Sequence, residues 1–402
     1  MRSTKAVATA TPSTVREINR AVTLNLIRLH EPVSRKELSN LSKIFPSNIS
    51  AIVDQLIEEG LVLEKRSRRL ARGRTPIDLY LNPNHLRVLG VNLRGDRTRV
   101  AWAGMSGRIL GTVSFKTPSS VNGLIVALKR AVELARKSGD EGTEPQVHCI
   151  GISVAGLVEP GSGTVVMSPA LPQFSGYALG RTISKELGLP VLADNDCNAG
   201  VLGELWHNEG EAAGAGNVVF LSFSEVGVGS GLVINSELYR GHNLAWAGEF
   251  GHMVVDPAGP KCRCGRRGCW ELYVSNQSTW RRYDAETGFT EERFRDLLHL
   301  AQEGDSRAVS AFETTAEYIS LGLSNITFAL NPSVIVVGGE ITKVWRRIRR
   351  TIESAWTSPS VHTEILLSRF SLGDLYIRGA VALALQDIFA GPRLGSGSAA
   401  VL

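Results

Sequence analysis

The sequence predicts an α/β protein that begins with a winged helix-turn-helix and continues as a body of two α/β lobes. Three observations lead to this prediction. Helical apolar spacing with capping signals fills residues 15–60, strand and helix patterns alternate after Pro83, and a strand, glycine-rich turn, strand unit occurs twice in the body. Five segments are therefore expected: a flexible lead-in (1–14), the winged helix-turn-helix (15–82), a first lobe (83–190), a second lobe (191–377) and a flexible tail (390–402). A C-terminal helix near 378–389 is expected to pack on the first lobe.

The helix-turn-helix prediction depends on three consecutive helical patterns. The first has an apolar stripe at spacings of three and four, expected to be its buried face: Val15, Ile18, Val22, Leu26 and Leu29. A capping box follows, with Ser34 as N-cap and Glu37 three residues on. The third helix begins at Pro46 and ends at Gly60. Its expected apolar face is Ile49, Val53, Leu56 and Ile57.

Positive charge is concentrated in this N-terminal segment. Residues 1–82 carry 14 Lys/Arg and 8 Asp/Glu, whereas the remaining 320 residues carry 30 and 31. Two strand-like pieces, near Leu61–Leu63 and Ile77–Leu81, flank a basic loop, the expected wing, with Lys65, Arg66, Arg68, Arg69, Arg72 and Arg74. At the start of the third helix, Ser47, Asn48 and Ser50 could reach base edges or phosphates. The segment therefore predicts binding to double-stranded DNA, with protein–protein docking or a merely solvated charged loop as the alternatives.

The composition excludes several other classes of protein. No apolar run approaches the roughly 18 residues of a membrane span, and the N-terminus lacks the apolar region of a signal peptide. A cytoplasmic protein without a membrane partner is therefore expected. Five cysteines, three of them within eight residues, fit a metal site in a reducing compartment better than a disulfide framework.

The clustered cysteines lie in a glycine-rich stretch, GEFGHMVVDPAGPKCRCGRRGCWE. Cys262, Cys264 and Cys269 can fold around one ion, and His252 is a plausible fourth ligand. Four protein ligands leave no open position, so this set predicts a structural zinc ion, with a disulfide or uncoordinated thiols as the alternatives.

Two carboxylates flank these expected zinc ligands. Glu249 precedes His252 by three residues and Glu271 follows Cys269 by two, so a bound metal would fix both carboxylates. Fixed carboxylates suit a neutral polyol, because each oxygen accepts hydrogen bonds from hydroxyls. Asn195 and Asp196 add an amide and a carboxylate at the end of a short apolar strand.

These motifs together resemble the ROK family (repressors, open reading frames and kinases), and within it the NagC/XylR-type transcriptional repressors. The most specific segments are VGVGSGLVINSELYRGHNLAWAGEFGH and the C-x-C-G-x-x-G-C-x-E run. The resemblance implies an actin-like, sugar-kinase-type pair of lobes with a zinc ion at this stretch. Carried over residue by residue, it implies five sugar-contacting side chains: Asn195, Asp196, Glu249, His252 and Glu271.

The family contains both repressors and sugar kinases. In its kinases, the residue matching Asp196 is the general base and the first phosphate loop reads D-x-G-G-T. Here that loop reads Asn92-Leu93-Arg94-Gly95-Asp96, and Val226 stands where the kinases carry a threonine in the second loop. The sequence therefore predicts a regulator without catalytic activity that represses carbohydrate-metabolism genes. An ATP-dependent hexose or N-acetylhexosamine kinase is the alternative. Expected partners are operator DNA, a small sugar or sugar-phosphate effector, and further copies of the chain in a homodimer or higher oligomer; control by a protein partner is a third possibility.

Overall fold

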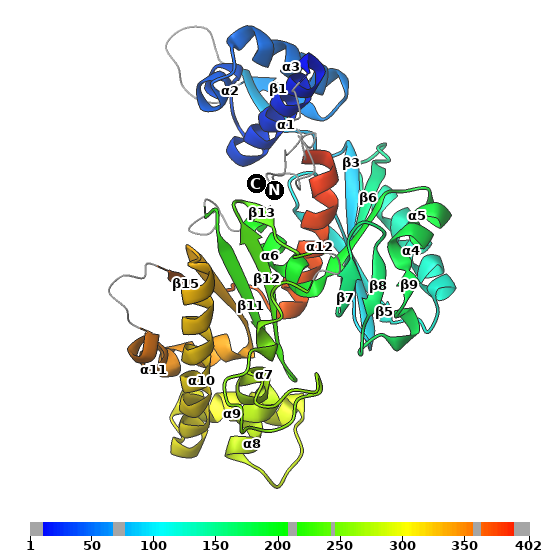
Figure 1. The fold of residues 1–402 in the computed structure, drawn as a ribbon. Coiled ribbons are helices and arrows are strands. Elements are labelled where there is room, and N and C mark those ends of the chain that lie inside the picture. Colours follow the sequence, from blue (N-terminus) through cyan, green and yellow to red (C-terminus); the bar gives the residue numbers. More distant parts are fainter. Residues whose placement is uncertain (1–10, 67–76, 208–214, 243–245, 357–362, 390–402) are drawn as a thin grey trace, which may run out of the picture. The chain divides into compact units, whose positions relative to one another are not determined.

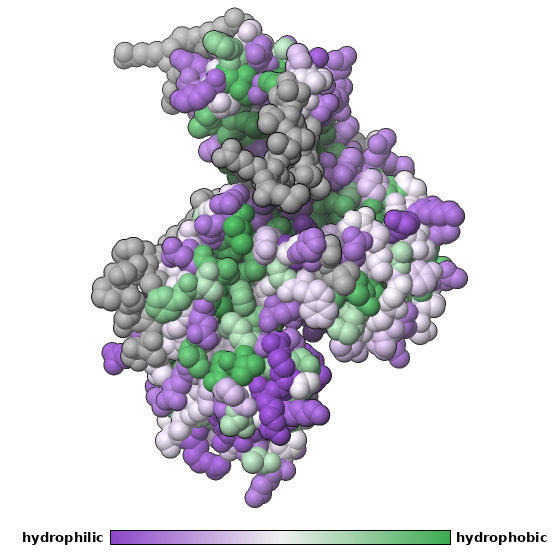
Figure 2. All heavy atoms as spheres, viewed as in Figure 1, coloured by the Kyte–Doolittle hydropathy of each residue, from purple (hydrophilic) through white to green (hydrophobic). Residues whose placement is uncertain are grey.

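A computed structural model describes residues 11–66, 77–207, 215–242, 246–356 and 363–389 (Figure 1). Its contacts divide the chain into two compact units, Met1–Asp194 with Ala380–Leu402, and Asn195–Gly379. The fold is α/β. Within the described ranges, no helix is long and apolar enough to cross a membrane. On the face drawn in Figure 2, hydrophilic side chains are spread over both units, with apolar patches among them.

The N-terminal part of the first unit has the predicted element order. Helices α1 (Pro12–His30), α2 (Arg35–Ser42) and α3 (Pro46–Glu58) precede an antiparallel hairpin of β1 (Val62–Arg66) and β2 (Ile77–Leu81). Two capping predictions are confirmed: Ser34 and Glu37 form the capping box that opens α2, and Gly60 follows α3 with a φ of +77°. Below, these five elements are called the head. Its fully buried side chains include Leu24, Ile27, Leu38, Ile49, Val53, Leu56 and Leu79.

The predicted buried face of the first helix was wrong. Val15, Val22 and Leu29 are 45%, 38% and 57% exposed, and the buried positions of α1 are Ala21, Thr23, Leu24 and Ile27. The helix carries apolar residues on two sides. Helices α2 and α3 and strand β2 pack against the side that carries Leu24 and Ile27. In α3, Ile52 is buried, whereas the predicted Ile57 is only half-buried. Helix α1 also begins at Pro12, inside the expected lead-in, because Thr11 caps it.

The body of the first unit is built around a five-stranded sheet in the order β10-β6-β3-β4-β5. Its strands are β3 (Leu86–Leu93), β4 (Arg97–Ala103), β5 (Ile109–Lys116), β6 (Gln146–Val154) and β10 (Val191–Asn195). A smaller sheet joins β7 (Leu157–Glu159), β8 (Thr164–Met167) and β9 (Tyr177–Ala178), and the helices are α4 (Val121–Arg136), α5 (Leu179–Leu187) and the end of α12 (Leu372–Phe389). Helix α12 packs closely on β6, since a Cβ at Gly151 would lie 2.0 Å from the Ala380 carbonyl oxygen.

The second unit repeats this sheet topology. Its order is β13-β12-β11-β14-β15, from β11 (Val218–Phe223), β12 (Val228–Ile234), β13 (Glu237–Leu238), β14 (Val334–Gly339) and β15 (Glu364–Leu367). In both sheets the first strand pairs antiparallel with the next strand in sequence and parallel with a later one: β3 with β4 and β6, and β11 with β12 and β14. The strand, glycine-rich turn, strand unit that occurs twice in the sequence is therefore the antiparallel pair that begins each sheet, β3 with β4 and β11 with β12.

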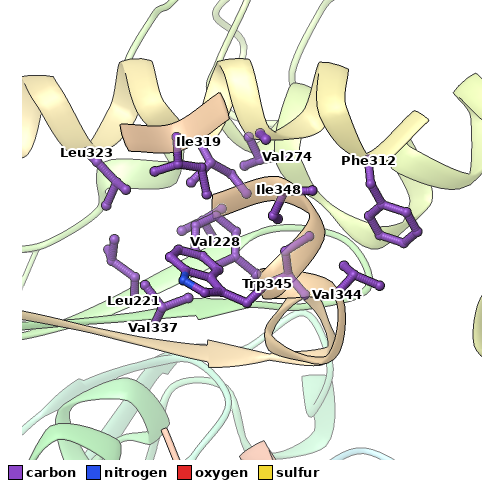
Figure 3. Close-up of a cluster of buried hydrophobic side chains, with 14 of the residues drawn as sticks. Leu221, Val228, Val274, Phe312, Ile319, Leu323, Val337, Val344, Trp345 and Ile348 are labelled. Atoms are coloured by element: carbon purple, nitrogen blue, oxygen red, sulfur yellow. The ribbon is translucent and has the colours of Figure 1, made fainter. Parts of the chain in front are cut away.

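Helices cover the sheet of the second unit and enclose its core. They are α6 (Asp196–His207), α7 (Glu271–Val274), α8 (Asn276–Tyr283), α9 (Glu291–Glu303), α10 (Ser306–Leu330) and α11 (Trp345–Trp356). Figure 3 shows side chains from the sheet and these helices meeting in one cluster, with Leu221 and Val337 from strands and Ile319, Trp345 and Ile348 from helices. This core forms the base on which the cysteine-containing stretch rests.

Candidate metal centre and its carboxylates

The stretch from Gly248 to Glu271 folds back on itself, as its glycines require. The backbone N–H of Gly268 donates to the Pro260 carbonyl at 2.9 Å, and that of Cys262 donates to the Arg266 carbonyl at 2.8 Å. Gly265 and Gly268 have φ values of +91° and +66°, which favour glycine. A Cβ at Gly268 would also lie 1.6 Å from the Asp256 carbonyl oxygen. A side chain at this position would therefore displace the loop that carries Cys269.

This fold brings the four predicted ligands together. One donor atom each from His252, Cys262, Cys264 and Cys269 lies within 4.8 Å of the others. The Cys262 Sγ is 3.6 Å from His252 Nδ1, and the Cys264 and Cys269 sulfurs are 3.5 Å apart. Tetrahedral zinc, with bonds of about 2.3 Å to sulfur and about 2.05 Å to nitrogen, needs edges of about 3.8 Å between sulfurs and about 3.6 Å between sulfur and nitrogen. The donor set therefore fits one tetrahedral ion, and its sulfurs are too far apart for a disulfide of about 2.05 Å.

The thiols of this set differ in acidity. Burial raises the pKa of Cys262 to about 12 and also raises that of Cys269. The exposed Cys264 accepts a hydrogen bond from the Arg266 backbone N–H, which lowers its pKa to about 6. A metal bound at neutral pH therefore has to displace protons from the two buried thiols.

Trp270, between the last cysteine and Glu271, anchors the stretch to the core. Its side chain is fully buried, and its Nε1 donates to the Tyr318 carbonyl of α10 at 2.6 Å. The indole also meets Phe223 edge-to-face, with ring centroids 5.7 Å apart. Helix α10 makes room with Gly322, where a Cβ would lie 2.1 Å from the indole. Trp270 thus fixes the positions of Cys269 and Glu271 relative to the core of the second unit.

Glu271 and Glu249 lie on either side of the His252 ring. The Glu271 side chain is 4% exposed, and its Oε1 is 3.6 Å from His252 Nδ1 and accepts a hydrogen bond from the Cys262 thiol at 3.1 Å. Its Oε2 is 3.4 Å from Nη2 of Arg263. The half-exposed Glu249 places Oε2 4.0 Å from His252 Nε2. The ring therefore turns Nδ1 toward the cysteines and Nε2 toward Glu249.

Glu249 has a perturbed carboxyl group. Desolvation is the largest cause that raises its pKa, and the charges of Glu271 and Asp196 act in the same direction. His252 and Arg263 oppose this increase in pKa. Three carboxylates thus influence one another in this part of the second unit.

Asn195 and Asp196 stand where β10 passes into α6. The Asn195 Oδ1 accepts the backbone N–H groups of Cys197 at 2.8 Å and Asn198 at 3.2 Å, so this side chain caps the helix. The glycines of β12 hold the same helical turn, because a Cβ at Gly229 would lie 2.4 Å from the Cys197 sulfur and one at Gly231 would lie 2.3 Å from its carbonyl oxygen. Asp196, the first residue of α6, is thereby fixed.

Five of the nine predicted DNA-contacting residues lie in the described part of the head, and four of these five are exposed. Ser47 and Asn48 are exposed at the start of α3, and Lys65 and Arg66 are exposed on β1. Ser50 is half-buried, and its carbonyl accepts a hydrogen bond from Arg35 at 3.2 Å. The other four predicted wing residues lie outside the described residues: Arg68, Arg69, Arg72 and Arg74.

The comparisons with known proteins agree with these motifs. Residues 88–387 match the ROK family. The chain belongs to the ROK family. It is 28% identical to the xylose repressor of Bacillus spizizenii over 381 residues, which cover 93% of this chain and 95% of that protein. The crystal structure of a ROK family transcriptional regulator, a homologue of the Escherichia coli Mlc protein, superposes with a TM-score of 0.79 at 25% identity, covering 94% of this chain and 99% of that one.

ROK kinases match a smaller part of this chain. The ROK glucokinase from Streptomyces griseus, solved with glucose and AMPPNP, matches with a TM-score of 0.61 and 28% identity. That match covers 99% of the kinase and 75% of this chain. About a quarter of this chain therefore has no counterpart in the kinase.

Two segments resemble the phosphate loops of ROK kinases, residues 92–96 and 226–231, and both make contacts within the protein. Asn92 is buried on β3 and accepts a hydrogen bond from Ser153 Oγ at 3.3 Å. The Arg94 carbonyl accepts one from Thr117 Oγ1 at 2.6 Å. In the second loop, a Cβ at Gly227 would lie 2.6 Å from Glu271 Oε2. The glycines at 227, 229 and 231 thus have packing reasons to be glycine that do not involve a nucleotide.

Two structural contributors carry no signal in the sequence. Arg263, between Cys262 and Cys264, contacts Glu271. Gly322 makes room for the Trp270 indole, a contact between residues far apart in the chain.

Proposed function

We propose that this chain is a sugar-responsive, DNA-binding transcriptional repressor of carbohydrate-metabolism genes. The observation that carries the proposal is the joining of a ROK body to an N-terminal head of three helices and a hairpin. The xylose repressor of Bacillus spizizenii matches 93% of this chain, whereas the match to the ROK glucokinase covers only 75% of it. The basic excess of residues 1–82 supports the assignment of DNA binding to the head.

The zinc ion in this proposal is structural. The Cys₃His set offers four ligands at distances suited to tetrahedral zinc and so leaves no position for a reacting water. When bound, the ion would supply cross-linking of the loop and no reaction chemistry. The residues themselves do the positioning: Trp270 ties the loop to α10, and Glu271 contacts Cys262 and Arg263.

The sugar is proposed to bind at Asn195, Asp196, Glu249, His252 and Glu271. His252 supports this arrangement because Nδ1 faces the cysteines and Nε2 faces Glu249, so one ring can serve both the metal and a ligand hydroxyl. Carboxylate oxygens are acceptors suited to hydroxyl groups. Asn195 is held in place by the two capping bonds that its Oδ1 accepts.

Asp196 is proposed to hold the sugar and not to activate it. Phosphoryl transfer needs backbone N–H groups and a metal around the ATP phosphates. Here the first loop places Arg94 and Asp96 where ROK kinases carry a glycine and a threonine, and Asn92 is bonded to Ser153 inside the protein. A hexose or N-acetylhexosamine kinase is therefore the second candidate, favoured by the retained Asp196 and by the match to a ROK glucokinase.

Control of DNA binding follows from linkage between two sites on one chain. A sugar can shift the repressor only by its different affinities for the DNA-binding and the released states. A homodimer is proposed because helix-turn-helix proteins commonly read two half-sites of a symmetric operator.

A mobility-shift assay on the DNA upstream of the protein's own gene tests the proposal. The panel should contain neutral hexoses, pentoses, N-acetylated sugars and their phosphates, each with and without ATP. The expected result is a shift that one sugar class alters without ATP, and a DNA affinity that falls steeply with salt. ATP-dependent phosphorylation of a sugar, abolished in Asp196→Asn, would establish the kinase instead.

A further inference from the structure

Phe45 stands out on the surface of the head. Its side chain is 76% exposed, more than that of any other large hydrophobic residue among the described positions. It is the N-cap of α3, directly before Pro46 and the exposed Ser47 and Asn48. These are the positions from which the second helix of a helix-turn-helix meets the major groove.

Neither local structure nor packing explains a phenylalanine here. N-caps favour Ser, Thr, Asp or Asn, whose side-chain oxygen accepts a helix N–H, and Phe45 makes no side-chain capping bond. The core of the head is completed by other residues, among them Leu38, Ile49 and Val53, all fully buried. Among the described residues, the ring therefore has no packing role in the core of the head and is available for a contact with another molecule.

The turn before α3 fixes the backbone that carries this ring. Ser39 Oγ donates to the Ile44 carbonyl at 2.7 Å, and the Ile44 N–H donates to Ser42 Oγ at 3.1 Å. The Phe45 carbonyl accepts the N–H groups of Asn48 and Ile49 at 3.0 and 3.1 Å. Because this backbone is already ordered by hydrogen bonds on both sides of Phe45, binding through the ring need not order it.

The chemistry of the ring restricts what it can read. Phenylalanine has no donor or acceptor, and the apolar group that the major groove offers is the 5-methyl of thymine. The nearest exposed residues along the chain are mainly polar, with Lys43 two residues before Phe45 and Ser47 two residues after it, although Leu41 is also exposed. Such surroundings match DNA better than an apolar protein partner. We propose that Phe45 reads a thymine 5-methyl group in the operator, an inference that rests on the proposed DNA binding by the head.

The test removes the methyl group alone. A 20-bp duplex is selected from a random library with the full-length protein, and each dT is then replaced by dU, which lacks the methyl. The expected result is that dU at one position of each half-site weakens wild-type binding about four-fold, the factor to which ~0.8 kcal/mol per buried carbon group converts. Phe45→Ala should bind the parent duplex at least as weakly as the wild type binds the dU-substituted duplex. In this variant, the dU substitution at that position should have no further effect, whereas the effects of dU at other positions should remain.

A second variant separates reading from folding. Phe45→Ser supplies a side chain that can cap α3, so its thermal midpoint should equal or exceed that of the wild type while the dU effect is still lost. Ser47→Ala, two residues away, should retain the dU effect. The inference is overturned if Phe45→Ala keeps both the parent affinity and the dU profile, which would point to a protein contact, or if it weakens binding but leaves every dU effect in place. Failure to select any duplex would remove the proposed DNA binding itself, and this inference with it.

Discussion

Replacement of Trp270 by phenylalanine should destabilise the second unit and loosen the metal loop. The substitution removes the hydrogen bond from Nε1 to the Tyr318 carbonyl, which costs about 0.5–1.5 kcal/mol net because this carbonyl keeps its partner within α10. The smaller ring also lacks two of the buried carbon atoms beside Gly322, which adds about 1.6 kcal/mol at ~0.8 kcal/mol per carbon. We therefore expect Trp270→Phe to lower the free energy of unfolding by about 2–3 kcal/mol.

The matched control lies in the same unit. Trp246 is 55% exposed, so Trp246→Phe should change the unfolding free energy by less than about 0.5 kcal/mol. Urea unfolding followed by far-UV circular dichroism measures both variants, with the metal content of each determined in parallel. If Trp270→Phe behaves like Trp246→Phe in both measurements, the indole does not anchor the loop and the reasoning above is refuted.

Three further predictions concern the same stretch. Gly268→Ala should lower the thermal midpoint and weaken metal retention, because its Cβ would collide with the Asp256 carbonyl; unchanged metal content in a purified variant would contradict this. Cys264→Ser should reduce bound zinc from about one ion per chain to a small fraction, measured by elemental analysis, whereas Cys149→Ala in the first unit should keep its zinc. Sugar affinity, measured calorimetrically, should fall between pH 7 and pH 5, because the raised pKa of Glu249 lets its carboxylate protonate above the usual range and lose acceptor capacity. Glu249→Gln should bind more weakly with a flatter pH profile, and a wild-type affinity independent of pH would count against a role for this carboxylate.

Local signals in the sequence were sufficient for the capping box and for the cluster of potential metal ligands. The capping box of Ser34 and Glu37 involves residues three apart, and the ligand set of His252 and the cysteines lies within one short stretch. Hydrogen-bond and ligand geometry act at these separations regardless of the rest of the fold. Such features can therefore be predicted from spacing alone.

Features that depend on distant partners could not be predicted in this way. Helix α1 has apolar residues on two sides, and only docking decides that Leu24 is buried and Leu29 exposed. The contact of Trp270 with Gly322 joins residues far apart in the chain, as does that of Gly229 with Cys197. The packing partners of Gly227, Gly229 and Gly231 lie on α6 and α7, so the sequence alone could not explain why these positions are glycine.

The central claim is that one chain senses sugar at its carboxylates and reads DNA with its head. The most direct test measures the dissociation constant for operator DNA with and without the effector sugar, in the wild type and in Glu249→Ala. We predict that the sugar changes the wild-type constant by about 5- to 150-fold, and that Glu249→Ala abolishes this change while binding DNA as tightly as the sugar-free wild type. Loss of both DNA binding and sugar response in a folded Glu249→Ala protein would contradict separate sensing and reading sites.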